Sequence, residues 1–258
     1  MSITSAMFTG VSGLLANAEG INVIGNNLAN VNTVGFKAGR MLFSDMLSAN
    51  IGNNSQIGRG TQIQKVDNIF SQSSFESTEI VSDVALQGPA FFEVQDAAGN
   101  NYLTRAGAFR TDSAGNLINP DGYFVLDSAG AKITLTNPAK ITGINNTGLI
   151  TYVDTAGATQ TTATGIGVVV VPNVGALQKA GGTLYDVNLS IAAGSGALTA
   201  SAADGTTNKI MSNSLEQSNV DMAGQFVKMI LTQRAYSANS KTITTADEMT
   251  QEVLNLKR

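Results

Sequence analysis

The residues that interrupt helices are concentrated in the middle of this 258-residue chain. All four prolines lie between positions 89 and 172, and the only glycine after Gly205 is Gly224. Proline removes a helical hydrogen bond, and glycine costs a helix about 1 kcal/mol relative to alanine. Long helices are therefore expected only near the two ends, with short elements between them.

Near the N-terminus, apolar and small residues recur at alternating steps of four and three, which is the heptad spacing of a coiled coil. They are Met7, Val11, Leu14, Ala18, Ile21, Gly25 and Leu28, with Phe8 and Leu15 beside them. Glycines between positions 10 and 25 weaken this helix, so packing has to stabilise it. The Asn- and Gly-rich stretch 25–37 predicts a helix exit and a shaped turn.

The segment from about 214 to 257 predicts the longest helix of the chain. The four–three spacing runs through Met222, Phe226, Met229, Gln233, Tyr236, Ser240 and Ile243, and resumes in a shifted frame at Ala246, Met249, Val253 and Leu256. A second apolar row contains Ala223, Val227 and Ile230. Two rows exceed what one partner helix covers, so we expect at least two neighbours.

The middle of the chain predicts β-structure joined by tight turns. An Asp-x-Ala-Gly motif begins at Asp96, Asp112, Asp127 and Asp154, between apolar or aromatic segments. Aspartate opens such turns and glycine takes the positive-φ position, which predicts hairpins. Calcium binding is the alternative, but the twelve-residue loop with a terminal Glu is missing, so turns are favoured.

The amino-acid composition excludes most kinds of catalytic and metal-binding chemistry. The chain has no His and no Cys, which excludes imidazole acid–base catalysis, thiol chemistry, disulfides and the usual zinc ligands. The acid pairs Glu76/Glu79 and Asp247/Glu248 are typical of solvated surface. We therefore expect no catalytic, cofactor-binding or metal-binding residues, and no cofactor.

Charge and hydropathy exclude two classes of partner. The net charge is −4, so the chain lacks the basic surface that nucleic acid requires. No apolar run approaches the roughly 20 residues of a membrane-spanning helix, and residues 1–36 carry only Glu19 as a charge. We expect no nucleic-acid binding, no membrane insertion and no cleaved signal peptide.

Two apolar helical ends around a β-rich body favour self-assembly, and a head-to-tail contact that does not close gives a filament. Two other classes of function compete with this hypothesis. A carbohydrate- or surface-binding module is disfavoured because Trp is absent and aromatics are 6%. An enzyme acting on cell-wall polymer would need an acidic pair in a cleft.

Several motifs resemble those of the bacterial flagellar rod and hook proteins. Residues 9–14 (TGVSGL) and 25–37 (GNNLANVNTVGFK) resemble the N-terminal signature, and residues 218–236 and 247–258 the C-terminal one. Residues 85–92 and 102–109 resemble the first β-rich core segment. Within this family the ending at 255–258 favours the hook protein, whereas the length and the stretch 175–185 also suit the distal rod protein.

The resemblance implies an α+β fold. Residues 1–36 and 214–258 would pair as a coiled-coil-like terminal domain, and residues 37–213 would form a central β-rich domain with the outer domain reduced or absent. The subunit interface would contain Met7, Val11, Leu14, Ile21, Asn26, Asn27, Leu28, Asn30, Phe36, Met222, Phe226, Val227, Met229, Ile230, Tyr236, Ile243, Met249, Val253 and Leu256.

The resemblance also implies a structural function, in which the chain is a hook subunit that assembles into a helical tube and transmits motor torque. A distal rod subunit is the alternative. The expected partners are many copies of the chain, other axial proteins of the rod and hook–filament junction, the hook cap and the export apparatus. The expected location is the flagellum, reached by type III export beyond the inner membrane.

Overall fold

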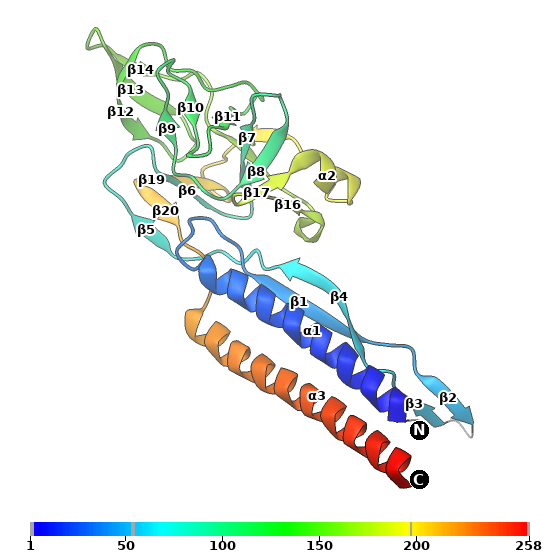
Figure 1. The fold of residues 1–258 in the computed structure, drawn as a ribbon. Helices are drawn as coiled ribbons and strands as arrows, with labels where there is room; N and C mark the ends of the chain where they lie inside the picture. The colour runs from blue at the N-terminus through cyan, green and yellow to red at the C-terminus, as the bar shows by residue number, and fades with distance from the viewer. Residues whose placement is uncertain (1–2, 53–54, 197, 257–258) are drawn as a thin grey trace. The chain divides into compact units, whose positions relative to one another are not determined.

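The chain divides into two compact units in a computed structural model that describes residues 3–52, 55–196 and 198–256. The helical unit contains Met1–Val31, Ala38–Ile69 and Val220–Arg258, and the β unit contains Asn32–Lys37 and Phe70–Asn219. The α+β class is confirmed, with a helix near each end and β-structure between them (Figure 1).

The helical unit is built on two long antiparallel helices, α1 (Ile3–Ala29) and α3 (Met222–Leu256), which lie side by side (Figure 1). Small residues of α1 allow the two helices to pack closely. A Cβ added at Gly10 would lie 3.0 Å from Ile243 Cγ1, and one added at Gly20 would lie 3.4 Å from Thr232 Cγ2. The glycines that weaken α1 as an isolated helix are therefore the residues that let α3 pack against it.

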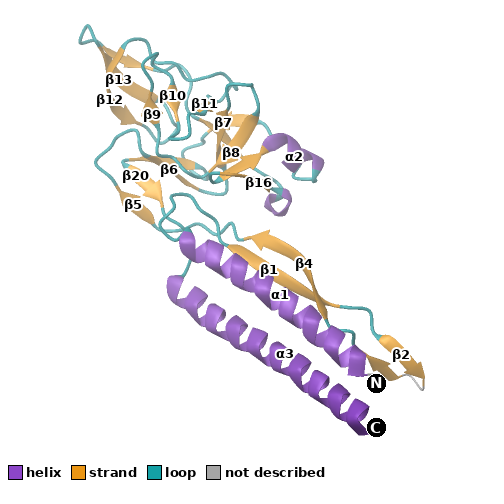
Figure 2. Cartoon of the chain, in the orientation of Figure 1, coloured by secondary structure: helices purple, strands orange, loops and turns teal. Residues whose placement is uncertain are grey.

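Strands β1 (Gly39–Asp45) and β4 (Thr61–Asn68) form an antiparallel ladder that contacts α1 (Figure 2). A short hairpin of β2 (Ala49–Gly52) and β3 (Ser55–Ile57) lies between them in sequence. The ladder is tied to α1 at Thr61, whose backbone N–H donates to Ser12 Oγ over 3.3 Å. Residues 38–69 thus belong with the helices, and not with the central domain in which they were expected.

The main sheet of the β unit is ordered β16-β17-β8-β7-β11-β10-β9, and β15 pairs with both β7 and β18. Smaller sheets are β12-β13-β14, β6-β19 and β5-β20. The strands are β5 (Phe75–Ser77), β6 (Val84–Gln87), β7 (Phe91–Gln95), β8 (Asn101–Thr104), β9 (Arg110–Thr111), β10 (Leu117–Ile118), β11 (Phe124–Val125), β12 (Pro138–Ile144), β13 (Ile150–Asp154), β14 (Thr159–Thr161), β15 (Gly167–Val169), β16 (Gln178–Gly181), β17 (Leu184–Asp186), β18 (Ala200–Ala202), β19 (Lys209–Ser212) and β20 (Ser214–Glu216). The helix α2 (Val187–Ala192) and the 3-10 turn η1 (Val174–Ala176) complete the unit.

Strand β7 is central to the core because its neighbours lie on both sides. Phe92 packs into one apolar cluster, where its ring meets Phe109 edge-on at 5.3 Å. Phe91, the next residue, packs into a second cluster with Tyr185. Alternate residues of one strand therefore fill the two clusters, as the pleat requires.

The predicted Asp-x-Ala-Gly turns are confirmed. Gly99, Gly115, Gly130 and Gly157 have φ between 80° and 93°. In the second turn, Asp112 Oδ1 accepts backbone hydrogen bonds from Ala114 (2.9 Å) and Asn116 (2.7 Å). The carboxylates thus satisfy backbone donors of the turn itself.

The predicted bounds of the helices need correction. Helix α1 ends at Ala29, and residues 32–37 belong to the β unit. Helix α3 begins at Met222, not at 214, because Ser214–Glu216 pair with Phe75–Ser77 as β20 and β5. Apolar spacing does not reveal this, since the residue that holds the strand in place is the buried Glu216. No helix in the described ranges is long and apolar enough to cross a bilayer.

Candidate assembly surface and a buried ion cluster

The heptad stripe that α1 buries is not the one its large apolar residues predict. The buried positions are Gly10, Gly13, Ala16, Gly20, Ile24 and Asn27. Most of these residues come one position before a residue of the predicted apolar stripe. Successive residues of an α-helix point in directions about 100° apart, so the buried face differs from the predicted one. The bulky side chains of α1 therefore flank the helix pair instead of filling its seam.

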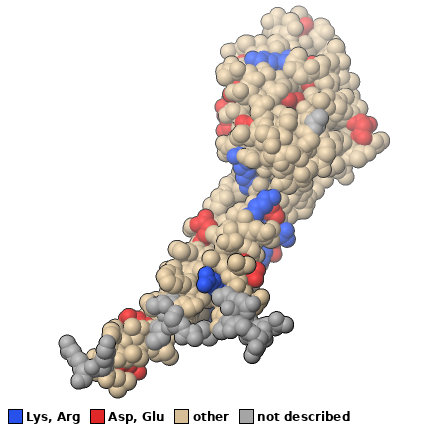
Figure 3. Space-filling view, turned by 90° about the vertical axis from the view of Figure 1, so that its right-hand side faces the viewer, with Lys and Arg blue, Asp and Glu red and all other residues tan. Residues whose placement is uncertain are grey.

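Pairing in this way leaves many large apolar side chains exposed on the helical unit. On α1, Phe8 is 74% exposed and Leu15 is 63% exposed. On α3 the exposed apolar residues are Met222, Phe226, Val227, Ile230, Leu231, Tyr236, Met249, Val253, Leu254 and Leu256. Charges are sparse on the face of the molecule in Figure 3, consistent with a charged fraction of 13%. Extensive exposed apolar surface of this kind marks a site of association.

The predicted interface residues fall into three groups in the single chain. The exposed group contains Val11, Asn26, Met222, Phe226, Val227, Ile230, Tyr236, Met249, Val253 and Leu256. The half-buried group contains Met7, Leu14, Ile21, Leu28, Asn30, Met229 and Ile243. Asn27 and Phe36 are buried within the chain, at 1% and 7% exposure. The exposed group is available to a neighbour, whereas the last two residues hold elements of their own chain.

The buried side chain of Asn27 forms hydrogen bonds that connect α1 with other elements of the helical unit. Its Nδ2 donates to Gly39 O, and Gly39 N donates to its Oδ1, both over 2.8 Å. The same Nδ2 lies 3.4 Å from Gln225 Oε1. The side chain thus pairs with β1 much as a neighbouring strand would, and links α1, β1 and α3.

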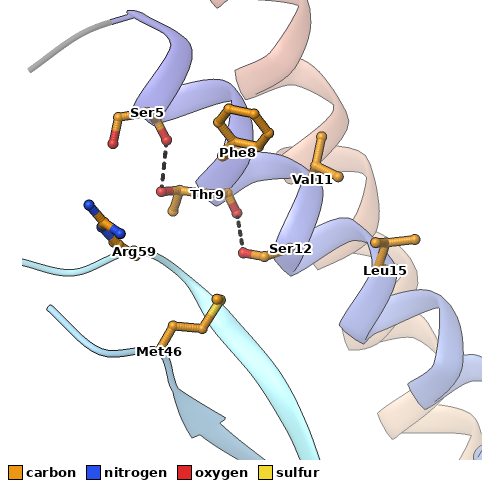
Figure 4. A pocket seen from close by; sticks show the side chains of 8 residues that line it. All are labelled: Ser5, Phe8, Thr9, Val11, Ser12, Leu15, Met46 and Arg59. Atoms are coloured by element: carbon orange, nitrogen blue, oxygen red, sulfur yellow. Dashed lines mark hydrogen bonds between the residues drawn. The ribbon is translucent and has the colours of Figure 1, made fainter.

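A groove in the helical unit lies between α1 and the chain around Met46 and Arg59 (Figure 4). Its volume is about 520 Å³, and its lining is Ser5, Phe8, Thr9, Val11, Ser12, Leu15, Met46 and Arg59. Thr9 Oγ1 donates to Ser5 O over 3.0 Å, and Ser12 Oγ donates to Thr9 O over 2.8 Å. Because the Thr9 and Ser12 hydroxyls donate to the helix backbone, the groove presents mainly an apolar wall, with the Arg59 guanidinium and the Ser5 hydroxyl beside it. Sequence reasoning missed Met46 and Arg59, which only the fold brings to α1.

The β unit contains a buried ion cluster formed by Lys37, Arg105 and Glu216. Lys37 Nζ lies 2.7 Å from Glu216 Oε1, and Arg105 NH1 lies 3.4 Å from Glu216 Oε2. The three side chains are at most 3% exposed. Burial lowers the pKa of Lys37, and the hydrogen bond and charge of Glu216 oppose that shift. Burial also lowers the pKa of Arg105, again opposed by Glu216.

Backbone groups around the ion cluster join segments that are distant in sequence. Lys37 Nζ donates to Ser71 O over 2.8 Å, and Ser73 N donates to Glu216 Oε1 over 3.1 Å. Gly35 N donates to Glu216 O over 2.8 Å. The cluster therefore fixes, within the β unit, the three segments next to which the chain passes into the helical unit. The sequence offered no periodic signal for it.

Many of the exposed side chains of the helical unit are apolar. No group of three or more His, Cys, Asp or Glu side chains among the described residues is arranged to hold a metal ion. Two paired helices with extensive exposed apolar surface, in a chain that also has a β unit, are typical of a structural protein that assembles with others.

Comparisons with known proteins identify the family. A model of the flagella basal body rod protein matches residues 7–37, the flagellar hook protein FlgE/F/G D1 domain matches 85–152, and the flagellar basal body rod FlgEFG protein C-terminal model matches 211–256. The chain is 40% identical over 265 residues to the flagellar basal-body rod protein FlgG of Bacillus subtilis, covering 98% of this chain and 99% of that protein. It belongs to the flagellar rod and hook family of axial structural proteins.

Two other relatives, a rod protein and a hook protein, differ in how much of their length this chain matches. The rod protein FlgG of Caulobacter vibrioides is 33% identical over 98% of this chain and 99% of its own length. The hook protein FlgE of Borreliella burgdorferi is 38% identical, but over only 51% of this chain and 34% of its own length. These matches agree better with the distal rod protein, the alternative, than with the hook protein that the sequence motifs favoured.

Proposed function

We propose that this chain is a subunit of the distal rod of the bacterial flagellum, where many copies form a tube that transmits torque from the motor. The observation that carries the proposal is the end-to-end match to rod proteins of nearly equal length. The hook relative, in contrast, is much longer than the chain it matches. This difference in length supports the further proposal that the outer domain of hook proteins is reduced or absent in this chain.

Assembly would bury the exposed apolar surface of the helical unit between copies. The two helices already satisfy their inner faces within one chain, so the outer rows remain for neighbours. Fully burying a large apolar side chain contributes about 1.5–3 kcal/mol. The predicted interface residues that are exposed, together with Phe8, Leu15, Leu231 and Leu254, are the ones we assign to these contacts.

The β unit would carry the mechanical load at the segments that lead to the helices. Its ion cluster holds residues 35–37, 71–73 and 216 together, so twisting one segment has to displace the others. Other axial proteins of the rod and hook, the hook cap and the type III export apparatus are the proposed partners. The proposed location is beyond the inner membrane, in the basal body.

The test is complementation of a strain that lacks its own distal rod protein. Expression of this chain should restore straight rods that span the envelope, seen by electron microscopy of isolated basal bodies, and should restore motility. Restoration of curved external tubes in a strain lacking hook protein, without rescue of the rod mutant, would contradict the rod assignment and favour the hook.

A further inference from the structure

The groove beside α1 has the character of a site for an apolar helix that carries an acidic group. Phe8, Leu15 and Met46 make its apolar wall, and Arg59 is the charged residue of its lining. None of the ion pairs in the described part of the chain includes Arg59. The polar groups needed to orient a small molecule are few, because Thr9 and Ser12 donate to the helix backbone.

Helix α3 has a basic half and an acidic half. Lys228, Arg234 and Lys241 are its only charges up to position 246, and Asp247, Glu248 and Glu252 are its only charges from there to Leu256. The basic half would repel Arg59, whereas the acidic half would attract it. Charge complementarity therefore selects the end of α3 and not its beginning.

The end of α3 lies beside the first described turn of α1 and exposes its apolar side chains. Gly10 faces Ile243 and Gly20 faces Thr232, so this antiparallel register places Met249 opposite the first described residues of α1. Met249, Val253 and Leu256 are 58%, 57% and 87% exposed. Glu252 follows Met249 by three residues and precedes Leu256 by four, so it shares their side of the helix.

We propose that the groove receives the last two turns of α3 from a second copy of this chain. Met249, Val253 and Leu256 lie against the apolar wall, and Glu252 pairs with Arg59. The contact uses an apolar helix face in a groove, with the charge pair setting its register. Because the groove and the helix end are different surfaces, each copy offers one and fills another, which gives an open-ended polymer. This inference rests on the proposed function as a polymer subunit.

Cross-linking tests the contact directly, because the chain has no cysteine of its own. Full-length Leu15→Cys and Val253→Cys variants are mixed at concentrations where the wild-type chain sediments as polymer, and are then oxidised. We expect a disulfide-linked mixed dimer. The matched control mixes Leu15→Cys with Val227→Cys, which lies in the basic half of α3 and is equally exposed at 57%. We expect no mixed dimer in that control.

Charge reversal provides the second measurement. Arg59→Glu and Glu252→Arg should each raise the critical concentration for sedimentation about 3- to 10-fold, as expected for an exposed ion pair turned repulsive. The double variant should return the critical concentration to within about twofold of the wild-type value. Lys228→Glu, an exposed charge on the other half of α3, should leave it within the same range.

The results of these experiments distinguish failure of the docking proposal from failure of the proposed function as a polymer subunit. If the wild-type chain polymerises but the Leu15/Val253 mixture does not cross-link, or cross-links no better than the Leu15/Val227 control, the docking proposal is wrong and the polymer stands. Failure of the double variant to recover also overturns the pairing of Arg59 with Glu252. A wild-type chain that stays monomeric under every condition overturns both proposals.

Discussion

At the scale of single residues, Glu216 is the anion on which both buried cations of the β unit depend. Its two carboxylate oxygens pair with Lys37 and Arg105, and Arg105 also lies over the ring of Phe91 at 4.7 Å. Buried charges are tolerated only when they are paired, because desolvation is costly. Removing Glu216 would leave two cations in a dry site.

We therefore expect Glu216→Gln to destabilise the β unit by about 3–5 kcal/mol, the typical cost of breaking a buried ion pair. The measurement is urea unfolding followed by tyrosine fluorescence, since Tyr102, Tyr123, Tyr152 and Tyr185 all lie in the β unit. Glu79→Gln removes an exposed carboxylate and should change stability by less than about 0.5 kcal/mol. Equal effects of the two substitutions would show that the buried pairing contributes little.

The turn aspartates make the β unit sensitive to acid. The side chain of Asn116 and then its backbone N–H hydrogen-bond to Asp112, which holds the pKa of Asp112 below 3.8. A depressed pKa stabilises the folded state above the unfolded-state pKa, and this contribution is lost as the pH falls through the folded-state value. Asp96 has the same arrangement with Asn100 and the same direction of shift.

Unfolding of the β unit should consequently become easier as the pH falls below about 4. Glu93 has the opposite effect on stability. Burial raises its pKa, so protonation at low pH removes the free-energy cost of keeping a charged carboxylate buried. Asp112→Asn keeps the oxygen that accepts the two backbone hydrogen bonds, loses the one that accepts from Asn116 Nδ2, and does not ionise. Urea midpoints at pH 7 and pH 3 should differ less for Asp112→Asn than for the wild-type chain, and an unchanged difference would refute this account of the turn.

At the scale of elements, the small-residue stripe of α1 decides how the two long helices pair. Gly10 lies against Ile243 and Asn239, and Gly13 lies against Asn239. Gly25 belongs to the predicted seam, yet nothing lies within 4 Å of a Cβ added there. The two stripes therefore predict opposite outcomes for the same substitution.

Gly10→Leu should disrupt the pairing of α1 with α3, at a cost of about 1–3 kcal/mol for overpacking. Gly25→Leu should be neutral or stabilising, because leucine is a better helix former and has open space. Helical circular dichroism during thermal unfolding measures both. If Gly25→Leu lowered the midpoint as much as Gly10→Leu, the predicted seam and not the observed stripe would be the buried one.

At the scale of the whole molecule, stability and assembly should depend on different apolar residues. Leu231 is 61% exposed, whereas Ile24 is 9% exposed within the helix pair. Leu231→Ser should raise the critical concentration for polymer about 5- to 30-fold, corresponding to about 1–2 kcal/mol of lost burial, and leave unfolding almost unchanged.

Ile24→Ser provides the matched comparison, because it should destabilise the chain itself. Sedimentation at a series of concentrations measures assembly, and urea unfolding of dilute protein measures stability. Loss of stability in Leu231→Ser would mean that this side chain supports the fold and not the contacts between copies.

The family and the turns were predictable because their signals are local. Gly115 and Gly130 occupy the positive-φ positions that the motif predicts, and the helical ends follow from where proline and glycine are absent. The groove could not be predicted, because Met46 and Arg59 reach α1 only through the β1–β4 ladder.

Local sequence signals predicted the helical ends, the β-structure with tight turns between them, and the family of axial proteins. These properties depend on residues close together in the chain. Contacts between distant segments set which stripe of α1 is buried, that residues 38–69 join the helices, and that the segment ending at Glu216 is a strand and not the start of α3. The physical reason is that heptad spacing sets a period but not a face, and a buried charge is stable only where its distant partners, here Lys37 and Arg105, meet it.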